Sequence, residues 1–187
     1  MKKILLAIGI LSGFYSYAQI PLGFKAGVNV NTIGIRHKQN EALGFDSYTS
    51  FHVGVFTKLK FSNKFTFIPE LQFIEKGAGG GVKLGYIEAP LVLSYQPIAL
   101  LNIEAGPSIG VNVSNNTILD YNKTDFGAIG GLRFNLTPKW SLLGRYYYGI
   151  SNLDKVYFNA GPNGVAQGWT ALYNRNFQFS VAYYLRK

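Results

Sequence analysis

Apolar and polar residues alternate through residues 101–113, which read Leu101-Asn102-Ile103-Glu104-Ala105-Gly106-Pro107-Ser108-Ile109-Gly110-Val111-Asn112-Val113. The odd positions are apolar, and the even positions are polar, charged or glycine. A period of two indicates a β-strand with one apolar and one polar face. The segment is about twice the usual strand length of about 5–6 residues. It fits either a strand of a large soluble β-structure or a strand that crosses a bilayer.

The same alternation recurs in seven further segments, which we expect to be strands. Their bounds are 22–31, 51–61, 65–76, 84–96, 125–136, 140–150 and 174–186. The connections between strands are long (34–49), short (62–64), moderate (77–83), short (97–100), long (114–124), short (137–139) and long (151–173). Short turns at one end and long loops at the other are typical of outer-membrane barrels. The sequence therefore predicts an all-β fold, an eight-stranded antiparallel up-and-down transmembrane β-barrel in the outer membrane.

Aromatic residues and prolines refine this expectation. Outward-facing aromatics lie beside the short turns and would form an interfacial girdle; they are Phe61, Phe65, Tyr95, Trp140 and Tyr183. Pro69, Pro90 and Pro107 fall inside expected strands, where proline cannot donate to the ladder. We therefore expect bulges or ladder interruptions that bend the wall, with a bulge at Pro107.

The first 18 residues have the layout of a secretory signal peptide. Lys2 and Lys3 precede the apolar run 4–14, and Ser16-Tyr17-Ala18 offers small residues at the −3 and −1 positions of a cleavage site. The expected organisation is a signal peptide at 1–18 and a barrel domain at 19–187. Without the two lysines the formal charge falls from +9 to +7, and an exported basic chain meets lipid phosphate or acidic polysaccharide rather than nucleic acid.

Several segments resemble the PorT-like family of Bacteroidetes outer-membrane β-barrel proteins. They are Gly23-Phe24-Lys25-Ala26-Gly27-Val28-Asn29, Ile68-Pro69-Glu70-Leu71, Tyr86-Ile87-Glu88-Ala89-Pro90-Leu91, Glu104-Ala105-Gly106-Pro107, Phe126-Gly127-Ala128-Ile129-Gly130-Gly131-Leu132 and Arg145-Tyr146-Tyr147-Tyr148-Gly149. The resemblance covers the chain from about residue 20 to its end. It implies a small porin-like barrel domain and a role near a secretion or gliding apparatus.

Seven charged residues fall on the polar faces of the expected strands and would point into the lumen. They are Lys25, Lys58, Glu70, Glu88, Glu104, Arg133 and Arg145. The interior of an eight-stranded barrel is just wide enough for side chains to fill it. Because unpaired buried charges are costly, these residues should neutralise one another across the lumen. We expect an ionic plug that closes the barrel; the alternative is a proton or ion relay.

The remaining candidate residues lie in the loops. The last long connection contains Tyr157, Phe158, Trp169 and Tyr173, which would either recognise a partner at the outer rim or fold over the barrel mouth. His37 and His52 have no Ser or Asp at triad-like spacing, and two lone histidines make a poor metal site. The chain has no cysteine. We therefore predict no catalytic residue, no cofactor and no metal.

Together these features predict a non-enzymatic outer-membrane barrel with a structural or interaction role. Its wall would contact outer-membrane lipid, its loops would contact envelope or secretion-apparatus proteins, and no nucleic acid is expected. Two alternatives stay open. An outer-membrane enzyme would assemble a His–acid or Ser–His pair at the loop rim. A secreted lipocalin-like barrel would have the reverse facing, with apolar residues around an internal ligand cavity.

Overall fold

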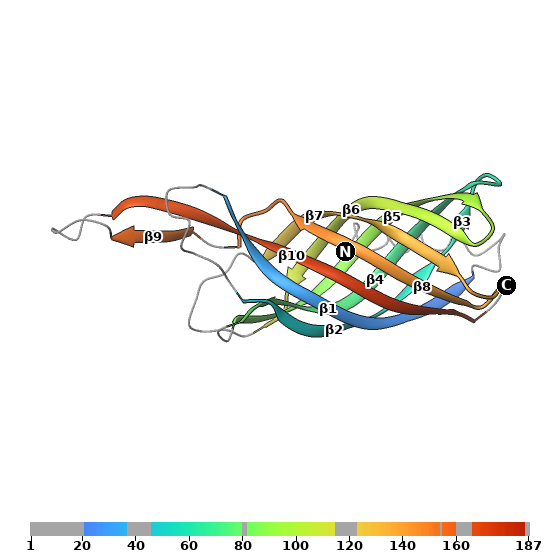
Figure 1. The fold of residues 1–187 in the computed structure, drawn as a ribbon, viewed down its shortest axis with the longest axis horizontal. Coiled ribbons are helices and arrows are strands. Elements are labelled where there is room, and N and C mark those ends of the chain that lie inside the picture. The colour runs from blue at the N-terminus through green and yellow to red at the C-terminus, as the bar shows by residue number, and fades with distance from the viewer. Residues whose placement is uncertain are drawn as a thin grey trace, which may run out of the picture.

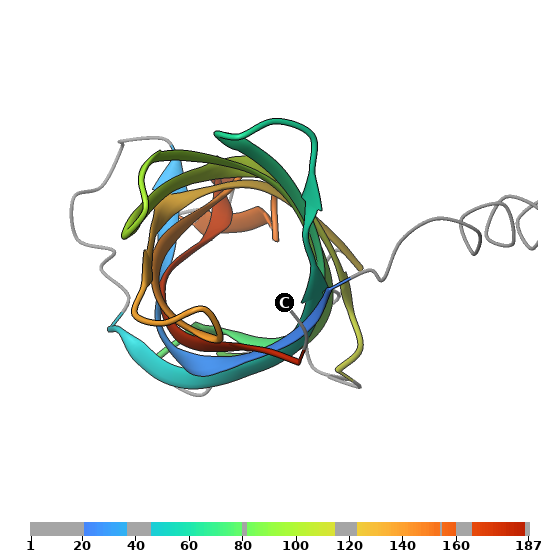
Figure 2. The same cartoon turned by 90° about the vertical axis from the view of Figure 1, so that its right-hand side faces the viewer.

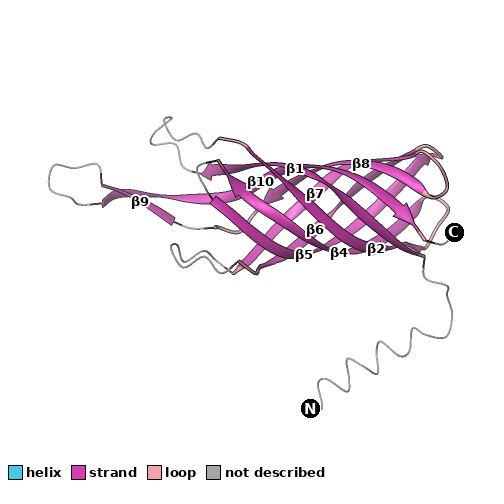
Figure 3. Ribbon diagram, turned by 90° about the horizontal axis from the view of Figure 1, so that it is seen from below, coloured by secondary structure: helices cyan, strands magenta, loops and turns pink. Residues whose placement is uncertain are grey.

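The computed structural model describes residues 21–36, 46–79, 82–114, 123–153, 155–159 and 166–185. Throughout these residues the regular structure is β-strand (Figure 3). The strands are β1 (Leu22–Arg36), β2 (Tyr48–Thr57), β3 (Leu59–Lys60), β4 (Phe65–Ala78), β5 (Val82–Ile98), β6 (Leu101–Asn112), β7 (Thr124–Asn135), β8 (Trp140–Gly149), β9 (Lys155–Asn159) and β10 (Ala166–Tyr184). Within the described residues, we find no helix with the length and apolar character needed to span a membrane.

The strands form one closed antiparallel barrel. Their order is β1-β2-β4-β5-β6-β7-β8-β10, and β10 pairs back to β1 from Gly23↔Tyr184 to Arg36↔Ala171. β3 continues β2 beyond Lys58 and pairs with β4 in the same register, so the wall has eight strands. Figure 2 shows the ring of strands end-on. Closure leaves no sheet edge, as a strand wall in hydrocarbon requires. The predicted fold is confirmed.

The connection predicted at residues 151–173 is wrong in part. It contains β9 and the first residues of β10, which pair as a hairpin with Tyr157 opposite Trp169 and Val156 opposite Thr170. The hairpin extends beyond the barrel wall at the long-loop end (Figure 1). Aromatic and β-branched residues favour strands, and this preference prevails although glycine and asparagine surround them.

The side chains of the wall point alternately outward and inward, as the sequence pattern predicts. Large apolar side chains point outward and remain exposed, for example Phe179 at 54%. Others include Phe24, Val28, Phe51, Val53, Leu71, Leu93, Ile103, Phe126 and Leu142. Apolar outward facing suits contact with lipid, and it is the reverse of what a soluble lipocalin-like barrel needs. That alternative is therefore excluded.

Aromatic side chains gather at the short-turn end of the wall, as predicted. The Phe61 and Phe65 rings stack with centroids 6.1 Å apart, and Tyr95 lies 5.1 Å beyond Phe65. On the other side of the barrel, Trp140 packs against Tyr183 at 4.7 Å. Rings at this level fit the interface between lipid and water.

The bulge predicted at Pro107 is wrong. Pairing between β6 and β7 runs without a shift through Pro107↔Ala128. Between β5 and β6 the ladder pauses after Pro90↔Ser108 and resumes in the same register at Leu93↔Ala105. The missing proline N–H removes a ladder bond but inserts no extra residue, so at Pro90 and Pro107 the wall is interrupted rather than bulged. The register shift in this pair of strands lies between Tyr95 and Ile98, beside the short turn.

Candidate functional site

The lumen contains the buried charged and polar side chains of the barrel. Inward-facing charged and polar side chains share the lumen with two clusters of buried apolar residues. One cluster, interleaved with the charged residues, comprises Phe56, Ile68, Val92, Ile129, Leu143, Ala182 and Tyr184. The cluster toward the long loops comprises Ile33, Ile74, Ala78, Leu84, Tyr86, Leu153 and Leu172. The alternating pattern did not predict these apolar clusters, because it assigned the inward faces to polar residues alone.

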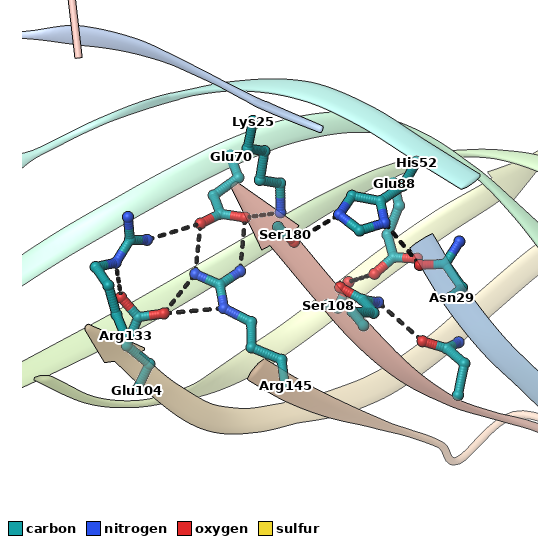
Figure 4. A network of polar contacts seen from close by, with 12 residues as sticks. Lys25, Asn29, His52, Glu70, Glu88, Glu104, Ser108, Arg133, Arg145 and Ser180 are labelled. Atoms are coloured by element: carbon teal, nitrogen blue, oxygen red, sulfur yellow. Dashed lines mark hydrogen bonds and ion pairs between the residues drawn. The ribbon is translucent and has the colours of Figure 1, made fainter. Parts of the chain in front are cut away.

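Arg145 of β8 is the centre of the charge network (Figure 4). Its Nη1 and Nη2 donate to the two carboxylate oxygens of Glu70 at 2.9 and 2.8 Å. Its Nε and Nη2 also donate to Glu104 Oε2 at 2.9 and 2.5 Å. A guanidinium offers five donors in a rigid plane, which allows it to bridge two carboxylates at once.

Two further cations complete what we call the central cluster: Lys25, Glu70, Glu104, Arg133 and Arg145. The Lys25 ammonium donates to Glu70, and Arg133 Nε donates to Glu104 Oε1 at 2.5 Å. These side chains are only 0–1% exposed. Charges so completely withdrawn from water are tolerated only when paired and hydrogen-bonded, which is the arrangement here. The structure thus brings together five of the seven predicted lumen residues.

Glycine makes the close packing around this cluster possible. A Cβ on Gly131 would lie 2.2 Å from the Gly144 carbonyl oxygen and 2.8 Å from Arg145 Cγ. A side chain at position 131 would occupy the space that the methylene groups of Arg145 fill, so only glycine fits there.

Glu88 belongs to a different group, the upper cluster of Lys76, Glu88 and Asp125. Lys76 Nζ lies 2.6 Å from Glu88 Oε2 and 3.1 Å from Asp125 Oδ2. The same ammonium lies 3.5 Å from the centre of the Tyr147 ring. The predicted contact of Glu88 with the other charges is therefore wrong. Lys76 and Asp125 were missed, although both occupy inward positions of the alternating pattern.

Lys58 also lies apart from the central cluster. Its Nζ is 4.0 Å from the centre of the Tyr184 ring, and no described carboxylate lies within 4.0 Å of it. Tyr184 stands between Lys58 and the cluster, because its hydroxyl accepts a 2.7 Å hydrogen bond from Arg133. The physical reason is the position of Lys58, which lies beyond the Phe56↔Glu70 pair on the side of the short turn at 62–64.

His52 has partners that its sequence position did not reveal. Its Nδ1 lies 2.7 Å from Asn29 Oδ1 and its Nε2 lies 2.6 Å from Ser180 Oγ. Because the Asn29 oxygen accepts, Nδ1 carries the proton and Nε2 accepts from Ser180. This is the order of nucleophile, base and orienting group in a hydrolytic triad. All three residues are buried in the lumen, away from the loop rim where a site was anticipated.

The predicted loop aromatics have mixed outcomes. Tyr173 belongs to β10 and is 6% exposed, which agrees with the buried alternative and not with exposed recognition. The backbones of Tyr157, Phe158 and Trp169 lie in the β9–β10 hairpin, and their side chains are outside what the structure describes. His37 lies outside the described residues. In the described ranges, no three His, Cys, Asp or Glu residues are grouped to hold a metal.

Comparison with known proteins agrees with this architecture. The Yersinia pestis attachment invasion locus protein Ail superposes with a TM-score of 0.55 at 14% identity, covering 90% of this chain and 100% of Ail. Neisserial surface protein A superposes with a TM-score of 0.53 at 12% identity, covering 87% of this chain and 96% of that protein. These similarities show the fold alone. No curated protein matches the chain.

A family model provides the assignment. The model described as the outer membrane protein beta-barrel domain matches residues 17–155, which is more than half of the chain. The closed wall, its apolar outer face and its solved structural neighbours agree with that match. The chain belongs to the outer membrane protein beta-barrel domain family, and it is an outer-membrane protein.

Proposed function

We propose that this protein is a closed, non-conducting barrel that supports the envelope or binds a partner through its long-loop end. The observation that carries the proposal is the central cluster, which joins β1, β4, β6, β7 and β8 across the lumen. The two clusters of buried apolar residues in the lumen add to the obstruction. A lumen of eight strands filled in this way leaves no continuous water column for solutes.

The charges strengthen this argument, because an ion could pass only by displacing them. Breaking a buried ion pair by removing one partner costs about 3–5 kcal/mol, since the remaining charge is left uncompensated. Arg145 is hydrogen-bonded to both Glu70 and Glu104, so opening the lumen would disturb several contacts together. The same contacts oppose the relay alternative, because each carboxylate is hydrogen-bonded to two cations that hold it in place.

Conductance in planar lipid bilayers tests the plug. The purified protein should insert without producing steady channel currents, whereas a double Glu70→Ala and Glu104→Ala variant should leak. Glu75→Ala is the matched control, because Glu75 is hydrogen-bonded to Tyr48 outside the central cluster. Steady ohmic channels in the unmodified protein would overturn the proposal.

The β9–β10 hairpin is the best-placed structure for a partner. It extends past the wall at the long-loop end, the end that faces outward in bacterial barrels of this type (Figure 1). The PorT-like motifs support a partner in the envelope or secretion apparatus. A photo-crosslinking amino acid at Tyr157 or Trp169 should give discrete products in intact cells. The same group at Phe179, which faces lipid, is the control.

The crosslinking experiment can also refute an interaction role for the hairpin. If the hairpin positions gave no product beyond that of Phe179, and removal of the hairpin left envelope resistance to detergent unchanged, the interaction role would be refuted. Variants of the central cluster provide an independent comparison, because they alter the lumen and leave the hairpin sequence intact.

The Ser180–His52–Asn29 chain favours an enzyme as the second candidate. Hydrolysis would require a substrate carbonyl beside Ser180 Oγ, but this hydroxyl points into a filled lumen. We therefore propose a structural role for the three residues. A fluorophosphonate probe should leave the folded protein unlabelled. Labelling that disappears in both Ser180→Ala and His52→Ala would instead establish a nucleophilic serine.

A further inference from the structure

Charge is distributed unevenly along the barrel axis. The residues nearest the short turns include four lysines, Lys58, Lys60, Lys64 and Lys139. Among the described residues, no carboxylate lies on the short-turn side of Glu70 and Glu104, and these two are held by the central cluster. Acidic residues instead accompany Lys76 in the upper cluster. The short-turn end is therefore uniformly basic.

A cavity of about 810 Å³ occupies the mouth of the barrel at this end. Lys58, Lys60, Asn102 and Asn135 line it, together with apolar side chains such as Leu100 and Leu136. We call this cavity the basic vestibule. Its lining includes no acidic residue. Its volume lies within the range of about 300–1,000 Å³ that is usual for ligand pockets.

The polar floor of the vestibule is fixed by internal hydrogen bonds. Asn135 Nδ2 donates to Asn102 Oδ1 at 2.7 Å and to the Ala99 carbonyl at 3.1 Å. Asn102 Nδ2 in turn donates to Ser94 Oγ at 3.0 Å. These amides are satisfied among themselves, so they shape the cavity without neutralising its lysines.

The residues behind the floor add to the positive charge. The central cluster contains three cations and two carboxylates, which leaves a net charge of +1. Arg133 Nη2 has no hydrogen-bond partner and is 3.8 Å from the nearest Glu70 oxygen. Arg133 donates a hydrogen bond to the Tyr184 hydroxyl, and Lys58 of the vestibule lies over the Tyr184 ring. These contacts connect the excess positive charge of the central cluster to the vestibule. The mouth of the barrel therefore attracts anions, and among the described residues no acidic group at this end neutralises it.

We infer that the basic vestibule binds an acidic peptide segment of a partner protein on the periplasmic side. This inference goes beyond the proposed function, because it concerns the opposite end of the barrel. The mixture of lysines, fixed amides and leucines suits a peptide, whose carboxylates, backbone and side-chain stems need different contacts. A free phosphate would use little of the 810 Å³. Lipid headgroups are less suited, since the lining consists of turns and inward-facing residues rather than the outer wall.

Fluorescence anisotropy on the purified full chain in zwitterionic detergent tests the inference. The probe is a fluorescein-labelled peptide of alternating glutamate and glycine, and the comparison peptide replaces every glutamate with glutamine. Only the acidic peptide should bind, and added salt should weaken it because exposed charges are screened. A double Lys58→Gln and Lys60→Gln variant should bind the acidic peptide with an affinity about tenfold lower.

The matched control removes two lysines from the other end, as Lys83→Gln with Lys123→Gln, and should bind as the unmodified protein does. Heat-modifiable gel mobility confirms folding of each variant; should the double variant not fold, Lys60→Gln alone tests the exposed lysine. Absence of acidic-peptide binding, or an equal loss in the control, would overturn the inference. Equal competition by inorganic phosphate would indicate a small-anion site, and loss of peptide binding in phosphatidylglycerol bilayers would indicate lipid; either result refutes the peptide assignment.

Discussion

Replacing Glu104 with glutamine removes the carboxylate that two arginines share. Arg133 and Arg145 both hold Glu104, at 2.5 Å in each case. The variant leaves three cations facing one carboxylate, so the net charge of the central cluster rises from +1 to +2. Glutamine keeps the size of the side chain, and the change therefore tests charge rather than packing.

The expected cost follows from burial. Loss of one partner from a buried ion pair costs about 3–5 kcal/mol, and the two pairs do not add because they share a carboxylate. For a chain of this size, about 1 kcal/mol shifts the melting temperature by roughly 2–4 °C, so a decrease on the order of 10 °C is expected.

Heat-modifiable gel mobility measures this change directly. The temperature at which half of the protein leaves the fast-migrating folded band should fall in Glu104→Gln and remain nearly constant in Glu75→Gln. Adding Arg133→Met to Glu104→Gln removes one unpaired cation and should restore part of the loss. An unchanged transition, or a decrease equal to that of the Glu75 control, would refute the reasoning.

Two further predictions use the same assay. Lys76→Met leaves Glu88 and Asp125 buried without their cation, so it should lower the transition temperature at neutral pH. A transition temperature equal to that of the unmodified protein would contradict this. Gly131→Ala should prevent folding or strongly destabilise the barrel, because its Cβ would lie 2.2 Å from a carbonyl oxygen. Gly144→Ala is the control, since its nearest contact is 3.9 Å, and equal effects would contradict the packing argument.

Sequence alternation was sufficient to predict the wall and much of the lumen. A period of two assigns every second residue of a strand to one face. This alternation alone places Lys25, Glu70 and Glu104 inside the barrel. Their mutual pairing then follows from the cost of burying charge. The same alternation also places Lys76 and Asp125 inside. They could have been predicted by continuing the alternation to the ends of each strand.

Other features depend on information that alternation does not contain. The partnership of His52 with Ser180 joins residues 128 positions apart, and it depends on how β2 and β10 flank β1. The isolation of Lys58 depends on Tyr184, which lies between it and Arg133. The β9–β10 hairpin depends on pairing that outweighs a loop-like composition. Each of these is set by three-dimensional register rather than by local sequence.

The central cluster has a consequence for the order of assembly. Glu70 lies on β4, while its cations come from β1 and β8, so the cluster draws on strands from distant parts of the chain. Lys25 and Glu70 can pair within β1–β4, and Glu104 can pair with Arg133 and Arg145 within β6–β8. The Arg145–Glu70 hydrogen bonds instead join the two halves of the chain. Because isolated charge is strongly unfavourable away from water, these bonds stabilise the finished barrel relative to a partly formed sheet.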